Sequence, residues 1–213
     1  MGIKERRERE KAEIREKILD AARDLFVSEG YESVSMRKIA DRIEYSPTAI
    51  YLHFKDKESV LRELCETDFY ALAREFQEIA RILDPVERLR AIGVAYARFG
   101  LSHPNHYRLM FMTPPPDPGQ DEDPLIERGN PEEDAYAFLK WTVGEALAAG
   151  LFRPGLEDVE LLAQTIWAGM HGVISLQIAK CNDDWVDWRP DEERIGLMNE
   201  TLIRGLICDS REE

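Results

Sequence analysis

The stretch VSMRKIADRIEYSPTAIYLHFKDKESVL, residues 34–61, contains two short amphipathic helical patterns, each with its own start signal. Ser35 is placed to cap the first helix, whose apolar residues recur at helical spacing. Ser46 is placed to cap the second, and Pro47 follows at the first helical position, where a backbone N–H has no intrahelical partner. Two capped helices joined by a few residues predict a helix-turn-helix, the arrangement that lays its second helix in the major groove of DNA.

A longer run of residues around this segment carries a family resemblance. Its landmarks are an apolar stripe, a glycine break and three short motifs: Ile18, Ala21, Ala22, Leu25 and Phe26, then Gly30-Tyr31, then residues 36–40, 46–54 and 57–61. In this order they make residues 14–64 resemble the N-terminal DNA-binding domain of TetR-type transcriptional regulators. The resemblance implies a three-helix domain that reads DNA.

The resemblance also implies which side chains meet DNA, through base contacts at the arginine position and the start of the second helix, and through phosphate contacts beside them. The implied set is Arg37, Lys38, Ser46, Pro47, Thr48, Ala49, Tyr51, His53 and Lys57. Arg37 can grip a guanine edge with its planar fork, and Thr48 offers a hydroxyl beside apolar surface that suits thymine methyl groups. Outside such a motif each would be interpreted as a solvated surface residue, and His53 as a histidine that satisfies a neighbour.

The chain departs from the family pattern in the second helix, which lacks glycine and has Thr48 and Ala49 instead, and in the turn before it. Glu44 occupies the turn between the two helices, where the family usually carries glycine or another small residue. If the turn requires a left-handed backbone, Glu44 costs on the order of 1 kcal/mol relative to glycine. The turn geometry, and not the motif itself, therefore depends on this position.

The formal net charge of −14 is unevenly distributed over the 213 residues. Residues 1–60 contain 13 basic and 13 acidic side chains, so the rest of the chain carries the whole acidic excess. We expect two domains, a DNA-binding domain over residues 1–60 and an effector-binding and dimerisation domain over residues 61–213. A neutral reading domain on an acidic body predicts modest DNA affinity with marked salt sensitivity.

Every periodic segment is helical, which predicts an all-α fold of about nine helices. The N-terminal helix-turn-helix domain has three of them, and the charged lead over residues 4–12 either continues the first helix or frays. The later helices are expected from residue 57 to about 83, 85 to about 102, 104 to about 112, 130 to 149, 157 to about 180 and 191 to about 207. Residues 113–130, with five prolines, are expected to form a loop.

Two stretches of the second domain carry a further resemblance. Residues 96–111 and 166–176 resemble a C-terminal domain found in a subset of TetR-type regulators, marked by Trp167, His171 and Gly172. This resemblance implies a pocket for a small-molecule effector, and the lack of clustered Arg or Lys favours a neutral, apolar or cationic one. The candidate lining residues are Tyr96, Phe99, Phe111, Phe138, Trp141, Trp167, Met170 and His171. Most are equally typical of an ordinary core, and His171 of a core histidine with a satisfied hydrogen bond.

The last two expected helices are the predicted subunit interface. One side of the final helix is apolar, with Ile195, Met198, Leu202, Ile203 and Leu206. Two copies would then pair as an isologous four-helix contact. A two-fold homodimer places two recognition helices about 34 to 36 Å apart, or a multiple of that spacing, so that they meet successive major grooves of a palindromic operator in double-stranded DNA.

Other features bear on location and chemistry. Leu161–Ala179 lacks charge over nineteen positions, yet its five polar residues favour a buried helix over a membrane span. The charged N-terminus does not resemble a signal peptide, and the three isolated cysteines are expected as thiols in a cytoplasmic protein. The histidines show no metal-ligand spacing, so we expect neither a metal nor a cofactor.

These observations predict a homodimeric DNA-binding transcriptional regulator, more in keeping with a repressor than an activator, that a small molecule releases from its operator. A first alternative is a DNA-binding regulator without a physiological ligand, which a well-packed body would favour. A second is an all-α enzyme that uses His106, His171 and carboxylates, but no nucleophile, paired-carboxylate or phosphate-loop motif supports it.

Overall fold

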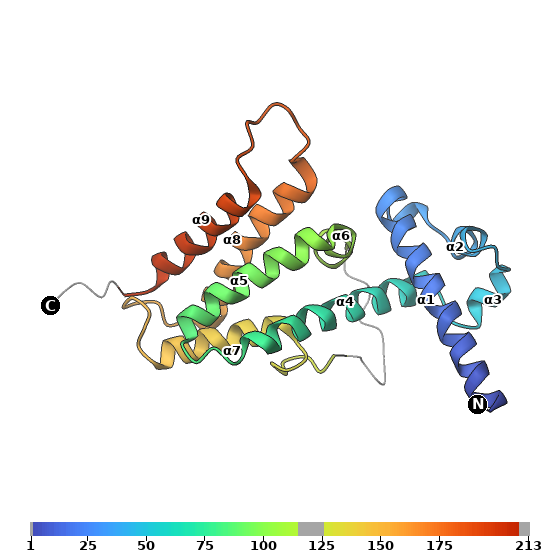
Figure 1. Cartoon of the computed structure of the whole chain (residues 1–213), viewed down its shortest axis with the longest axis horizontal. Coiled ribbons are helices and arrows are strands. Elements are labelled where there is room, and N and C mark those ends of the chain that lie inside the picture. The colour runs from blue at the N-terminus through green and yellow to red at the C-terminus, as the bar shows by residue number, and fades with distance from the viewer. Residues whose placement is uncertain (1, 115–125, 209–213) are drawn as a thin grey trace. The chain divides into compact units, whose positions relative to one another are not determined.

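The computed structural model describes residues 2–114 and 126–208, and within these residues the chain forms nine α-helices and one 3-10 turn (Figure 1). The all-α prediction is confirmed. The elements are α1 (Ile3–Glu29), η1 (Tyr31–Ser33), α2 (Met36–Arg42), α3 (Pro47–Tyr51), α4 (Lys57–Ile79), α5 (Pro85–Ser102), α6 (Pro104–Met112), α7 (Ala135–Ala148), α8 (Val159–Lys180) and α9 (Asp191–Leu206).

Two predicted helix boundaries are wrong by several residues. Helix α4 ends at Ile79 and not near residue 83, and Leu83 in the following turn is 92% exposed. Helix α7 begins at Ala135 and not at residue 130, because two caps follow one another. The carbonyl of Asn130 closes a separate turn by accepting from the backbone N–H of Asp134 at 2.8 Å, and the Asp134 carboxylate then caps the true helix.

The chain divides into two compact units, each with its own core. Unit 1 consists of Met1–Asp68 and Asn105–Leu125, and unit 2 of Phe69–Pro104 and Ile126–Glu213. Helix α4 starts in unit 1 and continues into unit 2. The boundary at residue 60, predicted from charge and motif, stays a prediction.

In unit 1, a buried carboxylate joins three helices. The side chain of Asp68 on α4 is only 4% exposed. It accepts two hydrogen bonds from Arg23 on α1, one of them at 3.0 Å, and lies 2.8 Å from Nδ1 of His106 on α6. Because a buried ion must be paired and hydrogen-bonded, this cluster fixes α1, α4 and α6 of unit 1 to one another.

In unit 2, apolar helix faces meet at small residues. Helix α5 packs against α7, α8 and α9, and α8 packs against α9. At Gly93 on α5 the amide of Asn199 from α9 lies so close that a Cβ would overlap its oxygen, and Asn199 Nδ2 donates to the Arg90 carbonyl at 2.9 Å. Gly169 on α8 gives Leu202 of α9 the same kind of close approach.

Unit 2 also contains a buried cation. Arg88 on α5 donates to Thr142 Oγ1 at 3.2 Å and to the Ile82 carbonyl at 3.0 Å, and it pairs with Glu145. Its guanidinium lies 4.2 Å from the centre of the Trp141 ring. The acceptors and the ring together compensate the burial of this charge.

Candidate nucleic-acid interface

Both helices of the helix-turn-helix begin at the predicted caps. Ser35 Oγ accepts from the backbone N–H of Lys38 at 3.3 Å, and Ser46 Oγ accepts from that of Ala49 at 3.2 Å. Pro47 occupies the first turn of α3. The inner faces carry Ile39 and Ile50, both fully buried, so α2 and α3 are anchored to the core and their other faces point outward.

The turn between α2 and α3 has a left-handed backbone at Glu44, the conformation that favours glycine. Glu44 has φ of +60°, and it is the one residue other than glycine with positive φ in the described ranges 2–114 and 126–208. The next residue, Tyr45, donates its N–H to the Ala40 carbonyl at 3.0 Å, which closes α2. The motif therefore forms with its usual turn although the favoured glycine is absent.

The residues predicted to read bases are accessible. Pro47 and Thr48 are exposed at the start of α3, and Ala49 is half-buried beside them. Tyr51 at the end of α3 is 55% exposed. The Arg37 side chain on α2 is 82% exposed and has only a long contact of 3.9 Å with Asp41. The uncharged, exposed start of α3, beside an arginine that has only a long ion contact, is suited to base edges in a groove.

The two lysines of the predicted set are engaged within unit 1. Lys57 Nζ donates to the Tyr31 carbonyl at 2.7 Å and lies 4.0 Å above the ring of the same residue. Lys38 Nζ donates to the Ser33 carbonyl at 3.1 Å and pairs with Glu29. Each lysine thus holds the 3-10 turn η1 in place, a role that the sequence analysis did not foresee.

His53, which follows α3, is half-buried next to α1. Its Nδ1 is buried and has no hydrogen-bond partner among the residues that the structure describes. Burial lowers the pKa of His53, and the nearby charges of Lys11 and Arg15 lower it further. The imidazole is therefore disposed to be neutral at pH 7.

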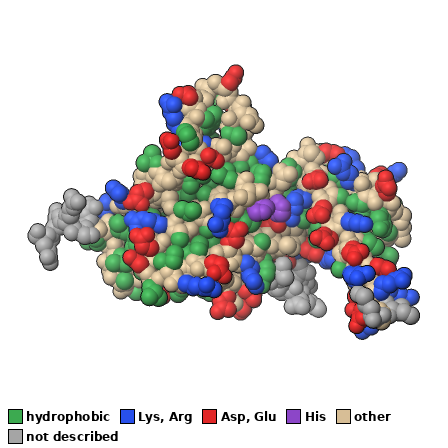
Figure 2. Space-filling view, in the orientation of Figure 1, with side chains coloured by type: hydrophobic (Ala, Val, Ile, Leu, Met, Phe, Trp, Pro, Cys, Tyr) green, Lys and Arg blue, Asp and Glu red, His purple; other side chains and the backbone are tan. Residues whose placement is uncertain are grey.

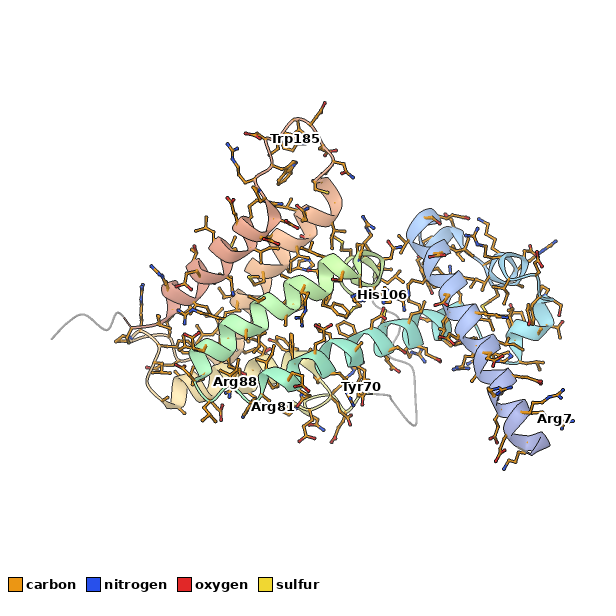
Figure 3. The ribbon with its side chains drawn as sticks, viewed as in Figure 1. Arg7, Tyr70, Arg81, Arg88, His106 and Trp185 are labelled. Atoms are coloured by element: carbon orange, nitrogen blue, oxygen red, sulfur yellow. The ribbon has the colours of Figure 1, made fainter. Side chains whose placement is uncertain are left out.

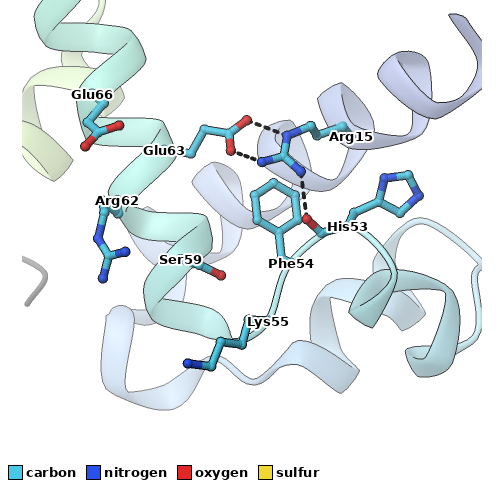
Figure 4. Close-up of a pocket in the computed structure, with 8 residues that line it drawn as sticks. All are labelled: Arg15, His53, Phe54, Lys55, Ser59, Arg62, Glu63 and Glu66. Atoms are coloured by element: carbon cyan, nitrogen blue, oxygen red, sulfur yellow. Dashed lines mark hydrogen bonds and ion pairs between the residues drawn. The ribbon is translucent and has the colours of Figure 1, made fainter. Parts of the chain in front are cut away.

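Sequence reasoning missed Arg15, which organises the end of the motif (Figure 4). Arg15 Nη1 donates to the His53 carbonyl at 2.7 Å, its Nε donates to Glu63 on α4 at 2.7 Å, and its guanidinium lies 4.2 Å from the centre of the Phe54 ring. The spacing could have indicated it, because Arg15 is three residues before the buried Ile18. A polar hollow of about 250 Å³ opens beside these residues, and Lys55 and Arg62 lie on its wall.

In unit 2, three of the predicted effector residues form a hydrogen-bonded group. Trp167 Nε1 on α8 donates to the Tyr96 hydroxyl on α5 at 2.9 Å, and that hydroxyl lies 3.5 Å from Nδ1 of His171. Since tryptophan can only donate, the Tyr96 hydroxyl oxygen is the acceptor of the bond from Trp167, and burial lowers the pKa of His171. The Tyr136 ring from α7 lies 5.7 Å from Trp167, which is itself 38% exposed.

The other predicted effector residues do not join this group. Phe138 and Met170 are fully buried in the core of unit 2, and Trp141 lies against Arg88. Phe99 contacts His103, with ring centroids 5.3 Å apart. Phe111 belongs to unit 1, next to Tyr107. The eight residues therefore include one polar-aromatic cluster and several ordinary core positions.

The predicted interface residues of α9 are only partly accessible. Ile195 and Ile203 are buried inside unit 2, where α9 packs against α5 and α8, so these two residues do not belong to an accessible surface. A different line is accessible, with Leu197 on α9 71% exposed and Leu161 and Leu176 on α8 at least half exposed. Helix α8 is thus buried on one side only. No helix in the described part of the chain is long and apolar enough to cross a membrane.

The capped helix pair, with its buried inner face and accessible outer face, defines a helix-turn-helix protein. The comparisons agree. Residues 18–64 match the family model described as bacterial regulatory proteins of the tetR family, and residues 89–192 match that of the tetracyclin repressor-like C-terminal domain. The chain belongs to the TetR family of transcriptional regulators, whose members are not enzymes.

Individual relatives support the same family. The chain is 34% identical over 93 residues to the HTH-type transcriptional repressor AcnR of Corynebacterium diphtheriae. The aligned stretch covers 44% of this chain and 43% of that protein. The chain is also 38% identical over 80 residues to the HTH-type transcriptional repressor Rv1474c of Mycobacterium tuberculosis, covering 38% and 37%. The aligned part is thus less than half of these curated relatives.

Solved structures resemble nearly the whole chain. One of them is that of a protein of unknown function from Rhodococcus sp. RHA1, with a TM-score of 0.69 and 26% sequence identity. The superposition covers 91% of this chain and 95% of that one. Both units therefore have a counterpart of known fold.

Proposed function

We propose that the chain is a repressor that binds a palindromic DNA operator as a homodimer and leaves it when a small molecule binds. The observation that carries this proposal is the outer face of α3, where Pro47 and Thr48 are exposed on a helix whose other side is fully anchored. The repressor activity is supported by the two relatives named as repressors.

The proposed DNA contacts divide into reading and holding residues. Arg37 and Thr48, with the apolar surface of Pro47 and Ala49, would contact base edges. Tyr51 and His53 would hold the phosphates, together with the remaining N–H groups of Lys38 and Lys57. Because both lysines also fix η1, their removal should weaken binding partly by loosening the motif.

The proposed dimer uses the accessible line of α8 and α9. Leu161, Leu176 and Leu197 are large apolar side chains that unit 2 leaves exposed on these two helices. Ala168 and Gly172 lie between the leucines on α8 and would let a second copy approach closely. Such a dimer would present two copies of α3 to the half-sites of a palindrome.

The proposed effector site is the cluster of Tyr96, Tyr136, Trp167 and His171. Three helices meet there, and its polar groups carry no net charge at pH 7 while His171 is neutral. The Trp167, His171 and Gly172 pattern of the ligand-responsive subset supports this assignment. The alternative of a regulator without a ligand is favoured by the complete burial of Phe138 and Met170.

Footprinting of the DNA that flanks the chain's own gene tests the proposal. A protected palindrome that is lost on addition of a neutral aromatic or apolar compound is the expected result. Thr48→Ala and Arg37→Ala should then change the preferred sequence, by about 1 to 3 kcal/mol for each base contact. The absence of specific protection anywhere in that DNA would refute the proposed function.

A further inference from the structure

The first turns of α1 segregate their charges by face. Lys4, Arg7 and Lys11 are spaced three and four residues apart, so they form one line along the helix. The same spacing continues to Ile14 and to the buried Ile18, which means that this line is an extension of the face that packs into unit 1. A core-facing line thus becomes a cationic line where the core ends.

The acidic side chains of this segment lie off that line, and two of them pair with cations that are also off it. Arg6 pairs with Glu10 at 2.9 Å and Arg9 with Glu13 at 3.5 Å, both on the outer side of α1. On the line itself, Lys4 has a contact of 4.0 Å with Glu8, whereas Arg7 and Lys11 have no ion pair among the described residues. Arg6 and Arg9 off the line are therefore compensated by close carboxylates, whereas on the line Lys4 has only a long contact and Arg7 and Lys11 have none among the described residues.

This part of α1 projects from unit 1 into solvent. Residues 4–13 are all exposed, and at 1.5 Å per residue the helix extends about 15 Å beyond Ile14. Figure 3 labels Arg7 near the free start of α1, and Figure 2 shows Lys and Arg side chains gathered there.

The line begins next to the DNA-reading helix. Arg15, one helical turn after Lys11 on α1, donates to the carbonyl of His53 at 2.7 Å, and His53 follows directly after α3. The charge of Lys11 also lowers the pKa of His53. From Lys11 the line continues along α1 to Arg7 and Lys4. A polyanion that lies against the end of α3 would therefore meet these three cations next.

We propose that Lys4, Arg7 and Lys11 form a second DNA-binding surface that holds the sugar–phosphate backbone outside the groove read by α3. This inference rests on the proposed function, because it takes the polyanion at α3 to be DNA. Long cationic side chains without a fixed partner suit phosphate oxygens and carry no sequence information. The positive end of the α1 dipole at Ile3 adds to the attraction.

Two charge-matched triple variants test the proposal. One replaces the line, with Lys4→Gln, Arg7→Gln and Lys11→Gln. The other replaces cations off the line, with Arg6→Gln, Arg9→Gln and Lys17→Gln. Both remove three positive charges and keep residues of good helix propensity, and circular dichroism would confirm that each folds.

The probe is a fluorescein-labelled DNA duplex of arbitrary sequence, titrated with the full chain at several salt concentrations. For the line variant, the slope of log affinity against log salt should shrink by about 2 to 3, since each lost phosphate contact removes about 0.9. Its affinity at low salt should fall roughly tenfold or more, and the off-line variant should change the slope by less than about 1.

Equal losses in the two variants would reduce the effect to net charge and overturn the proposal, as would an unchanged slope in the line variant. Binding of the line to vesicles of anionic phospholipid, with DNA binding unaltered by the substitutions, would assign the surface to membranes and also overturn it. If the wild-type chain bound no duplex at all, the proposed function would fail as well, a result that is distinct from a defect of one variant.

Discussion

Each of the two compact units is stabilised internally by a different kind of contact. In unit 1, charged side chains reach between helices, as Arg23 and His106 do toward Asp68 and Arg15 does toward Glu63. In unit 2, apolar faces meet at glycines, and Gly93 and Gly169 admit side chains from α9. Removing one member of an ion pair should therefore lower the stability of unit 1 most, whereas adding a methyl group at a helix-contact glycine should lower the stability of unit 2 most.

The largest expected effect is that of Asp68→Ala in unit 1. The change leaves the buried Arg23 guanidinium without its carboxylate, which should lower the free energy of unfolding by about 3 to 5 kcal/mol. Urea unfolding followed by circular dichroism measures this loss. Glu63→Ala is the matched control, because its pair with Arg15 is partly exposed and should contribute about 1 kcal/mol or less. Equal losses for the two variants would contradict the assignment.

The corresponding change in unit 2 is Gly93→Ala. The new Cβ overlaps the Asn199 amide, so the free energy of unfolding should fall by about 1 to 3 kcal/mol. The control is Gly144→Ala in α7, which meets open space and should stabilise by roughly 0.5 to 1 kcal/mol. Asn199→Ala should cost less in the Gly93→Ala background than in the wild type. Additive losses would mean that the two residues are not in close contact.

Local contacts could be predicted from the sequence, whereas contacts between distant residues could not. The caps at Ser35 and Ser46 are local signals, so both helices of the motif start where the sequence places them. The partners of Lys57 and Asp68 could not be found in this way, because Tyr31 and His106 are 26 and 38 residues distant. Long-range polar contacts leave no periodic pattern in a sequence.

The C-terminal interface shows a second limit. An apolar stripe on a helix indicates that this side of the helix is buried, but it does not indicate whether the same chain or a partner chain buries it. Ile195 and Ile203 are buried within unit 2, where α9 packs against α5 and α8, whereas Leu197 on the same helix is exposed. The sequence predicts three members of the aromatic cluster, Tyr96, Trp167 and His171. It does not predict the fourth, Tyr136 on α7, because that residue lies outside the stretches that carry the family resemblance.

A smaller effect is expected at the turn of the helix-turn-helix. Glu44→Gly removes the Cβ from a residue with φ of +60° and should stabilise unit 1 by on the order of 1 kcal/mol. Thermal unfolding followed by circular dichroism measures the gain. Glu44→Ala keeps the Cβ and removes the charge, so it should give no such gain. A similar gain from both substitutions would assign the effect to charge and not to backbone strain.

The smallest expected effect is a difference between one histidine of each unit in how its pKa responds to salt. Burial lowers the pKa of both His53 and His171 below the ordinary value of 6.5, and only for His53 do nearby cations add to it. The unfolded chain therefore takes up protons first as the pH falls below about 6.5, so the folded state loses stability in that range. Because salt screens charges but not burial, added salt should raise the pKa of His53 and leave that of His171 unchanged. Titration of the imidazole Cε1–H signals by NMR measures both values. Lys11→Gln should likewise raise the pKa of His53 alone, and an equal salt response of the two histidines would show that charge does not distinguish the two units at these positions.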